Sequence, residues 1–206
     1  EGYPGGMKNL SILLDVDGVL ADFVQGVLDV VFQETGLLIY ASEIHEWDFL
    51  RNLDNILKAK GLANAISHAA RIRQRILQAG FCANLKPFPA AIEAVNKLKE
   101  SCKVTLLTTP FYGNPYWKEE RSVWAQKHLG RVDVVHIRDK SPHWGNVFLD
   151  DKPDHVRAWG ERWSTRPING SPPLLWDTHQ NKSTTDLRRI TSWNEVIELI
   201  EAQTHS

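Results

Sequence analysis

The chain has few cysteines, little net charge and no long apolar stretch. Its two cysteines, Cys82 and Cys102, form no CxxC pair, so the sequence favours neither a cysteine metal site nor a disulfide framework. A formal net charge of −1 over 206 residues provides no basic field that would attract a long nucleic acid. The longest apolar runs have only the length of a strand, so we expect no membrane-spanning segment.

The first residues do not have the pattern of a secretory signal, and we expect a cytoplasmic protein. Met7 is the single methionine, so we expect it to be the natural start and residues 1–6 to be an added segment. Hydrophobic residues make up 42% and charged residues 24%, as in ordinary globular proteins. This length suffices for one core and a small accessory domain, and it leaves monomer and homodimer open.

Strand and helix patterns alternate along most of the chain. A first strand is predicted over 8–15, apolar on both faces, and a helix over 21–35. The later elements, in order, are helix 90–100, strand 103–108, helix 116–129, strand 132–136, strand 146–149, helix 153–159, strand 173–176 and helix 192–202. This alternation predicts an α/β fold with a doubly wound parallel sheet.

Residues 42–80 break the alternation because they contain helical and loop patterns but no strand pattern. We therefore predict a small helical cap over 25–85, inserted after the first strand, and a core domain formed by 7–24 and 86–206. In parallel sheets of this kind ligands bind beyond the carboxyl ends of the strands. The cap is expected to lie above that edge.

Polar residues follow three of the predicted strands and should meet at one edge of the sheet. They are Asp15 and Asp17 with Gly18, then Thr108 and Thr109, and finally Asp150 and Asp151, with Lys140 in the loop before the last strand. Residues two apart at a strand end point to the same side. Gly18 allows the backbone to turn sharply above such a site.

This set of groups is suited to phosphoryl transfer. A carboxylate and a phosphate about 4 Å apart repel each other by roughly 4 kcal/mol at an effective dielectric near 20, so a nucleophilic Asp15 needs a cation beside it. Oxygen ligands of this kind suit Mg²⁺, and Lys140 adds a fixed positive charge. Asp17 can serve as general acid, and the Thr108 hydroxyl can donate to a phosphoryl oxygen.

These residues resemble the four motifs of the haloacid dehalogenase superfamily of phosphohydrolases, in the same order along the chain. The matches are DVDGV at 15–19, LLT at 106–108, Lys140, and Asp150-Asp151. The resemblance implies that Asp15 forms an aspartyl-phosphate and that Asp17 is the acid and then the base. It implies that Mg²⁺ is bound by Asp15, the backbone carbonyl of Asp17, and Asp150, with Asp151 in support.

A narrower resemblance is to the 5′(3′)-deoxyribonucleotidases. It is carried by DVDGVLADF at 15–23, FPAAIEAV at 88–95, Thr108-Thr109-Pro110, Pro115-Tyr116 with Lys118, Arg138-Asp139-Lys140, Leu149-Asp150-Asp151, and 176–182 with Trp193. It implies a nucleoside monophosphate as substrate, with Phe23 stacking on the base. The sequence departs from that family at Phe111 and Tyr112, where relatives often have a lysine, at Lys152, which replaces an arginine, and throughout 37–80.

Several residues have two interpretations. Phe23 and Trp47 either contact substrate or belong to apolar cores, since apolar residues at helical spacing are usually buried. Lys118 either contacts substrate or is an exposed side chain on the surface of its helix. Thr109 either contacts phosphate or completes the turn before Pro110. The alternatives for the whole protein are a phosphatase for another small metabolite or a polynucleotide end, and a phosphate-binding domain without turnover.

Overall fold

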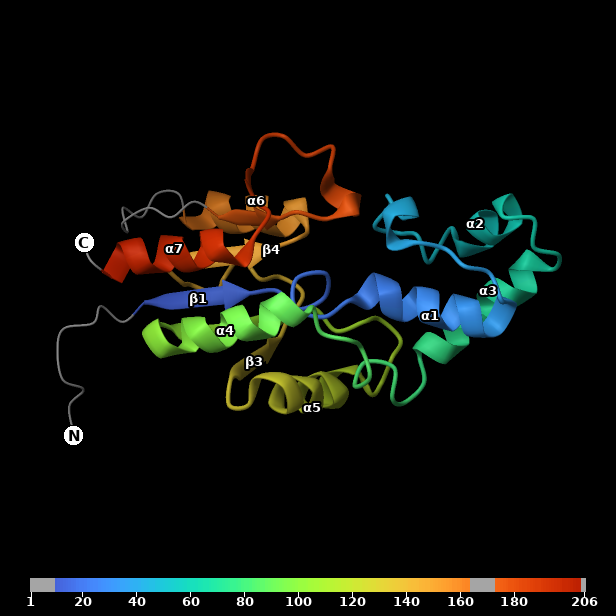
Figure 1. The fold of residues 1–206 in the computed structure, drawn as a ribbon, viewed down its shortest axis with the longest axis horizontal. Helices are drawn as coiled ribbons and strands as arrows, with labels where there is room; N and C mark the ends of the chain where they lie inside the picture. Colours follow the sequence, from blue (N-terminus) through green and yellow to red (C-terminus); the bar gives the residue numbers. More distant parts are fainter. Residues whose placement is uncertain (1–9, 164–172, 205–206) are drawn as a thin grey trace.

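The computed structural model describes residues 10–163 and 173–204 (Figure 1). Six parallel strands form one sheet in the order β3-β2-β1-β4-β5-β6. The strands are β1 (Ser11–Leu14), β2 (Lys103–Thr108), β3 (Asp133–His136), β4 (Val147–Asp150), β5 (Leu174–Trp176) and β6 (Arg188–Ile190). This sheet confirms the predicted α/β fold. The added segment predicted at 1–6 lies outside the described residues.

The helices follow the strands in the predicted order. They are α1 (Phe23–Thr35), α2 (Leu53–Ala59), α3 (Ala65–Ile76), α4 (Pro89–Ser101), α5 (Trp117–Leu129), α6 (Pro153–Trp163) and α7 (Trp193–Thr204), with short 3-10 turns η1 (Ala41–Glu43) and η2 (His179–Asn181). Strand β6 was not predicted, because it has three residues and two of them are arginines. Helix α6 continues past the predicted end because Gly160 serves close packing, with a Cβ there 2.9 Å from Pro173.

The central strand β1 is covered on both faces. Ile12 and Leu14 pack into the larger hydrophobic cluster, together with residues of α4, α5 and α7. Leu13 points the other way and packs with Phe148 and with Trp159 of α6. Because successive side chains of a strand alternate between faces, an apolar run of this kind can only be stable between two helical layers.

A separate hydrophobic cluster is formed by α1, α2 and α3. Val27 and Val31 of α1, Leu57 of α2 and Ile72 of α3 are all fully buried in it. Figure 1 shows these three helices grouped beyond the end of the sheet toward which β1 points. The helices therefore bury their apolar faces against one another. The bounds 25–85 for a cap stay a prediction.

The chain leaves the three-helix group through residues 80–87, and this connection is tied to the sheet domain. The Glu120 carboxylate on α5 accepts hydrogen bonds from the backbone N–H groups of Gly80 (2.5 Å), Cys82 (3.1 Å) and Ala83 (3.2 Å). The N–H of Asp22 donates to the carbonyl of Lys86 (2.8 Å), joining the outgoing and returning connections. One partly buried carboxylate thus satisfies three backbone donors that would otherwise need water.

Two expectations about absent features can be compared with this fold. Cys82 and Cys102 are both free thiols. Within the described ranges, every helix is too short or too polar to cross a lipid bilayer.

The three-helix cluster generates a prediction about stability. We expect Leu57→Ala to lower the free energy of unfolding by about 2–5 kcal/mol, because Leu57 is 0% exposed and its loss leaves a cavity. The control is Ile66→Ala on α3, whose side chain is 75% exposed and should change stability by less than about 0.5 kcal/mol. Urea unfolding followed by circular dichroism measures both. Equal effects of the two substitutions would contradict the assigned packing.

Candidate active site

The site begins where β1 ends. Asp15 directly follows the strand, and its N–H donates to the carbonyl of Leu149 at 2.9 Å, so the ends of β1 and β4 are held side by side. The chain then turns through Gly18, whose φ of +83° is one that glycine adopts without strain. A Cβ on Gly18 would lie 2.0 Å from Oδ2 of Asp151. The glycine therefore makes room for that carboxylate.

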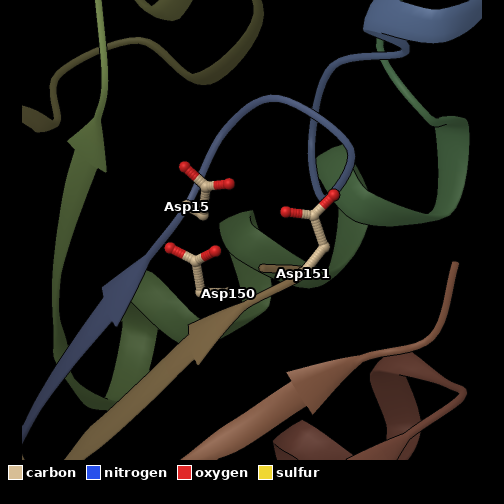
Figure 2. Close-up of side chains that lie close together, drawn as sticks. All are labelled: Asp15, Asp150 and Asp151. Atoms are coloured by element: carbon tan, nitrogen blue, oxygen red, sulfur yellow. The ribbon is translucent and has the colours of Figure 1, made fainter. Parts of the chain in front are cut away.

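Three carboxylates meet at this edge of the sheet. Figure 2 shows Asp15 after β1 and Asp150 and Asp151 at the end of β4, with their carboxyl groups close together. Carboxylate oxygens of the three residues lie within 4.8 Å of one another, and all three residues are buried. Oxygen donors at this spacing, with Gly18 leaving room for one of them, fit a divalent cation. The Asp17 side chain is not part of this cluster.

Lys140 is the cation that the structure itself supplies. Its buried ammonium group donates to Asp15 and, at 2.6 Å, to Asp150. Burial opposes a charge on Lys140, but the carboxylates of Asp15 and Asp150 raise its pKa above the usual range. The lysine is therefore a permanent positive charge between two of the three carboxylates.

The pKa values of the three carboxylates shift in different directions. Burial and the nearby Asp150 charge raise the pKa of Asp15 to about 6. Burial, followed by the charges of Asp15 and Asp150, raises the pKa of Asp151 well above its usual value. Burial opposes ionisation of Asp150 too, but Lys140 and a contact with His155 at 3.0 Å lower its pKa to about 2. Asp150 is thus the most firmly ionised of the three.

The two threonines after β2 have different surroundings. The hydroxyl of Thr108 is buried and has no hydrogen-bond partner among the described residues, so it is available to a ligand. The hydroxyl of Thr109 donates to the carbonyl of Ile137 at 3.2 Å, which supports the structural interpretation of that residue. Thr109 also lines the cavity beside the site, so the two roles are compatible.

Asp17 lines the same cavity and forms a hydrogen bond to a different cation. Its Oδ1 accepts a hydrogen bond from Nη2 of Arg121 on α5, which is fully buried. Burial raises the pKa of Asp17 above its usual value, and the Arg121 charge works in the opposite direction. Sequence reasoning did not single out Arg121. The available signal was its position between Trp117 and Trp124, where an inward-facing arginine needs a buried carboxylate.

The cavity has a volume of about 620 Å³ and is lined by both parts of the fold. Phe23 and Trp47 line it from the three-helix side, as does Arg51, and Arg138 and Lys152 line it from the sheet side. Phe23 also packs against Phe81, Phe111 and Trp117, with ring centroids 5.6–6.0 Å away, so it belongs to an aromatic cluster, and its predicted contact with substrate stays a prediction. Lys118 is exposed on α5 and is not among the lining residues.

Two further residues that sequence reasoning did not single out contact Asp150 and Asp151, one at the side chain and one at the backbone. His155 contacts Oδ2 of Asp150 and also lines the cavity. Buried Asn181 donates to the carbonyls of Asp151 (2.8 Å) and Trp176 (2.7 Å). His155 lies outside the motifs named from the sequence, and Asn181 lies in the matching segment 176–182, whose contact with Asp151 only the folded chain shows.

Comparison with known proteins agrees with this fold. A solved hydrolase of the haloacid dehalogenase superfamily from Geobacter sulfurreducens has a TM-score of 0.57 at 14% identity, covering 97% of this chain and 100% of that one. A Bordetella pertussis protein described as a candidate 5′(3′)-deoxyribonucleotidase is 28% identical over 192 residues, which is 90% of this chain and 94% of its own. The human cytosolic-type 5′(3′)-deoxyribonucleotidase is 28% identical over 196 residues, 91% of each chain.

The sheet order and the likeness to the solved hydrolase show that the chain has the α/β fold of the haloacid dehalogenase-like proteins. The family model described as 5′ nucleotidase, deoxy (pyrimidine), cytosolic type C protein matches residues 8–205. The chain therefore belongs to this family, and it is a phosphatase of the nucleotidase type.

The charge balance of the site generates a prediction about pH. The Asp15 pKa is higher in the folded than in the unfolded protein, so its contribution to stability is present below about pH 4 and lost as the pH rises through about 6. We expect the metal-free protein to lose on the order of 2 kcal/mol of stability across that range from this residue. A bound divalent cation should raise the Tm more at about pH 7 than at about pH 5.

Thermal unfolding across this pH range, with and without the cation, measures both effects. The matched control is Asp15→Asn, which should flatten the pH dependence and weaken the stabilisation by the cation. An unchanged pH profile in the variant would show that other groups carry the effect.

Proposed function

We propose that this protein is a Mg²⁺-dependent 5′(3′)-deoxyribonucleotidase that acts through an aspartyl-phosphate on Asp15. The observation that carries the proposal is the buried group of Asp15, Asp150 and Asp151 bridged by Lys140, in a chain of the deoxyribonucleotidase family. The relatives' names support the substrate class. The description of the human relative as the cytosolic type supports the cytoplasm as the location.

In the first step an oxygen of Asp15 attacks the phosphorus, and the bond to the ester oxygen breaks. Asp17 gives its proton to the leaving oxygen, which departs as the nucleoside hydroxyl. In the second step the Asp17 carboxylate takes a proton from water, and the resulting hydroxide attacks the phosphorus. The phosphate is released and both carboxyl groups return to their first state.

The other residues stabilise charge on the transferred group. Lys140 and the Thr108 hydroxyl, which has no hydrogen-bond partner among the described residues, would donate to phosphoryl oxygens, and Thr109 would add a third group at the same edge. Asp15, Asp150 and the backbone carbonyl of Asp17 would hold Mg²⁺, with Asp151 beside them. When bound, the metal neutralises the charge between nucleophile and phosphate.

The nucleoside would occupy the adjoining cavity. Its volume of about 620 Å³ lies within the range of small-molecule sites. Phe23 and Trp47 offer aromatic surfaces for stacking on a base, and Arg138 and Lys152 favour an anion. Lys118 remains a proposed contact that requires movement of its exposed side chain or of the substrate. In this proposal residues 25–85 are the cap and choose the substrate.

The first test is phosphate release from a panel of deoxy- and ribonucleoside monophosphates, a sugar phosphate, a 5′-phosphorylated oligonucleotide and an aryl phosphate. We expect Mg²⁺-dependent turnover of deoxynucleotides that EDTA abolishes. Asp15→Asn should lower turnover by at least about 10³-fold while the protein remains folded, because the nucleophile is lost. Light scattering on the same sample separates the monomer from the homodimer.

Each other outcome assigns a different function. Turnover of the sugar phosphate or the oligonucleotide but of no nucleotide contradicts the substrate class and retains the chemistry. Binding of phosphate without turnover of any ester identifies a domain that has lost catalysis. Full activity of Asp15→Asn rejects Asp15 as the nucleophile.

The cavity generates a further prediction, about the binding of the nucleotide. Trp47→Ala should raise the KM for the preferred nucleotide about 5- to 100-fold, because base–aromatic stacking contributes roughly 1–3 kcal/mol. The matched control is Trp144→Ala, since Trp47 and Trp144 are both 41% exposed but only Trp47 lines the cavity. Both variants should keep wild-type turnover of a small aryl phosphate that has no base. Equal KM changes in the two variants would remove Trp47 from the substrate site.

A further inference from the structure

Arg121 is a charged residue in a place where charges are rarely found. Its side chain on α5 is 0% exposed, and Nη2 donates to Oδ1 of Asp17, which is itself 24% exposed toward the cavity. An arginine is protonated in all ordinary conditions and cannot shed its charge on burial. Taking it out of water therefore costs several kcal/mol unless a partner compensates.

Arg121 does not use all the hydrogen-bond donors of its guanidinium group. Its Nε and Nη1 are buried and have no hydrogen-bond partner among the described residues. A guanidinium group retained only for stability would be expected to use more of its five donors. Its hydrogen bond goes to Asp17, two residues after the proposed nucleophile Asp15. This partner points to a role in the reaction.

The guanidinium group is also held rigidly. It lies 5.2 Å from the ring centre of Trp117 and 5.3 Å from that of Trp124, one helical turn away on either side. Trp124 is fixed in turn, since its Nε1 donates to the carbonyl of Leu85 at 2.7 Å. The preceding residue, Glu120, binds three backbone N–H groups of the connection at 80–83. A donor anchored in this way can hold its acceptor in one orientation.

We propose that Arg121 is a positioning residue that fixes the Asp17 carboxyl group for proton transfer. By occupying Oδ1, Arg121 leaves Oδ2 as the atom that carries the proton to the leaving oxygen and later accepts one from water. Arg121 stays protonated throughout, so each step balances on Asp17 and the substrate alone. This inference rests on the proposed function, because it assigns a task within the same two-step reaction.

The test compares two leaving groups in the first step. Without the proton of Asp17 a deoxynucleoside would have to leave as an unstable alkoxide, whereas 2,4-dinitrophenolate is a stable anion that leaves without a proton. Rapid-quench measurement of the aspartyl-phosphate gives the rate of this step for each substrate. We expect Arg121→Met to slow it about 10- to 100-fold with the nucleotide and by less than about 3-fold with dinitrophenyl phosphate.

Two further variants complete the design. Arg121→Lys keeps a charge but shortens the donor, so it should show the same selectivity for leaving group with a smaller loss. If circular dichroism shows that Arg121→Met does not fold, Arg121→Lys is measured in its place. Arg157→Met on α6 also removes an arginine paired with an aspartate, Asp186, away from the site, and should leave both rates within about 2-fold.

The results separate the inference from the function on which it rests. A folded Arg121 variant that slows both substrates equally, or neither, overturns the positioning role while the proposed function stands. A wild-type protein that forms no aspartyl-phosphate with either substrate overturns the proposed function itself. Selective loss with the nucleotide in a folded Arg121 variant supports both.

Discussion

The mutual repulsion of three buried carboxylates is the constraint on which the rest of the site depends. Asp15, Asp150 and Asp151 lie within reach of one ion, and burial makes each charge expensive. Lys140 offsets the charges of Asp15 and Asp150, and Asp151 keeps a strongly raised pKa. The protein has therefore concentrated more negative charge than its own cation offsets. A divalent metal bound there would relieve that excess and would couple metal binding to the stability of the fold.

The two aspartates of the first motif form hydrogen bonds to different cations, although only Val16 stands between them in the chain. Asp15 pairs with Lys140 from the loop before β4, whereas Asp17 pairs with Arg121 from α5 on another side of the turn. Lys140 is shared between Asp15 and Asp150, whereas Arg121 binds Asp17. In the proposed mechanism these different partners would favour an anionic nucleophile at Asp15 and proton exchange at Asp17.

The sequence was most informative where backbone geometry alone determines position. Strand ends of a parallel sheet meet at one edge, so Asp15, Thr108 and Asp150 could be placed together from their positions after apolar runs. Side chains that reach the site from a helix face carry no such signal, and Arg121 and His155 were missed for that reason. Strand β6 was missed because three residues, two of them arginines, do not produce a readable alternation.

Catalytic chemistry and substrate choice draw on different parts of the structure. The carboxylates stand on β1 and β4, whose side chains are packed on both faces, so their spacing is fixed by the most rigid part of the molecule. The cavity wall is shared with a three-helix group that has its own hydrophobic cluster. Because that cluster packs separately, residues such as Trp47 can be replaced without disturbing the carboxylates. Changes in substrate preference are therefore expected to arise from the helices, with the chemistry retained.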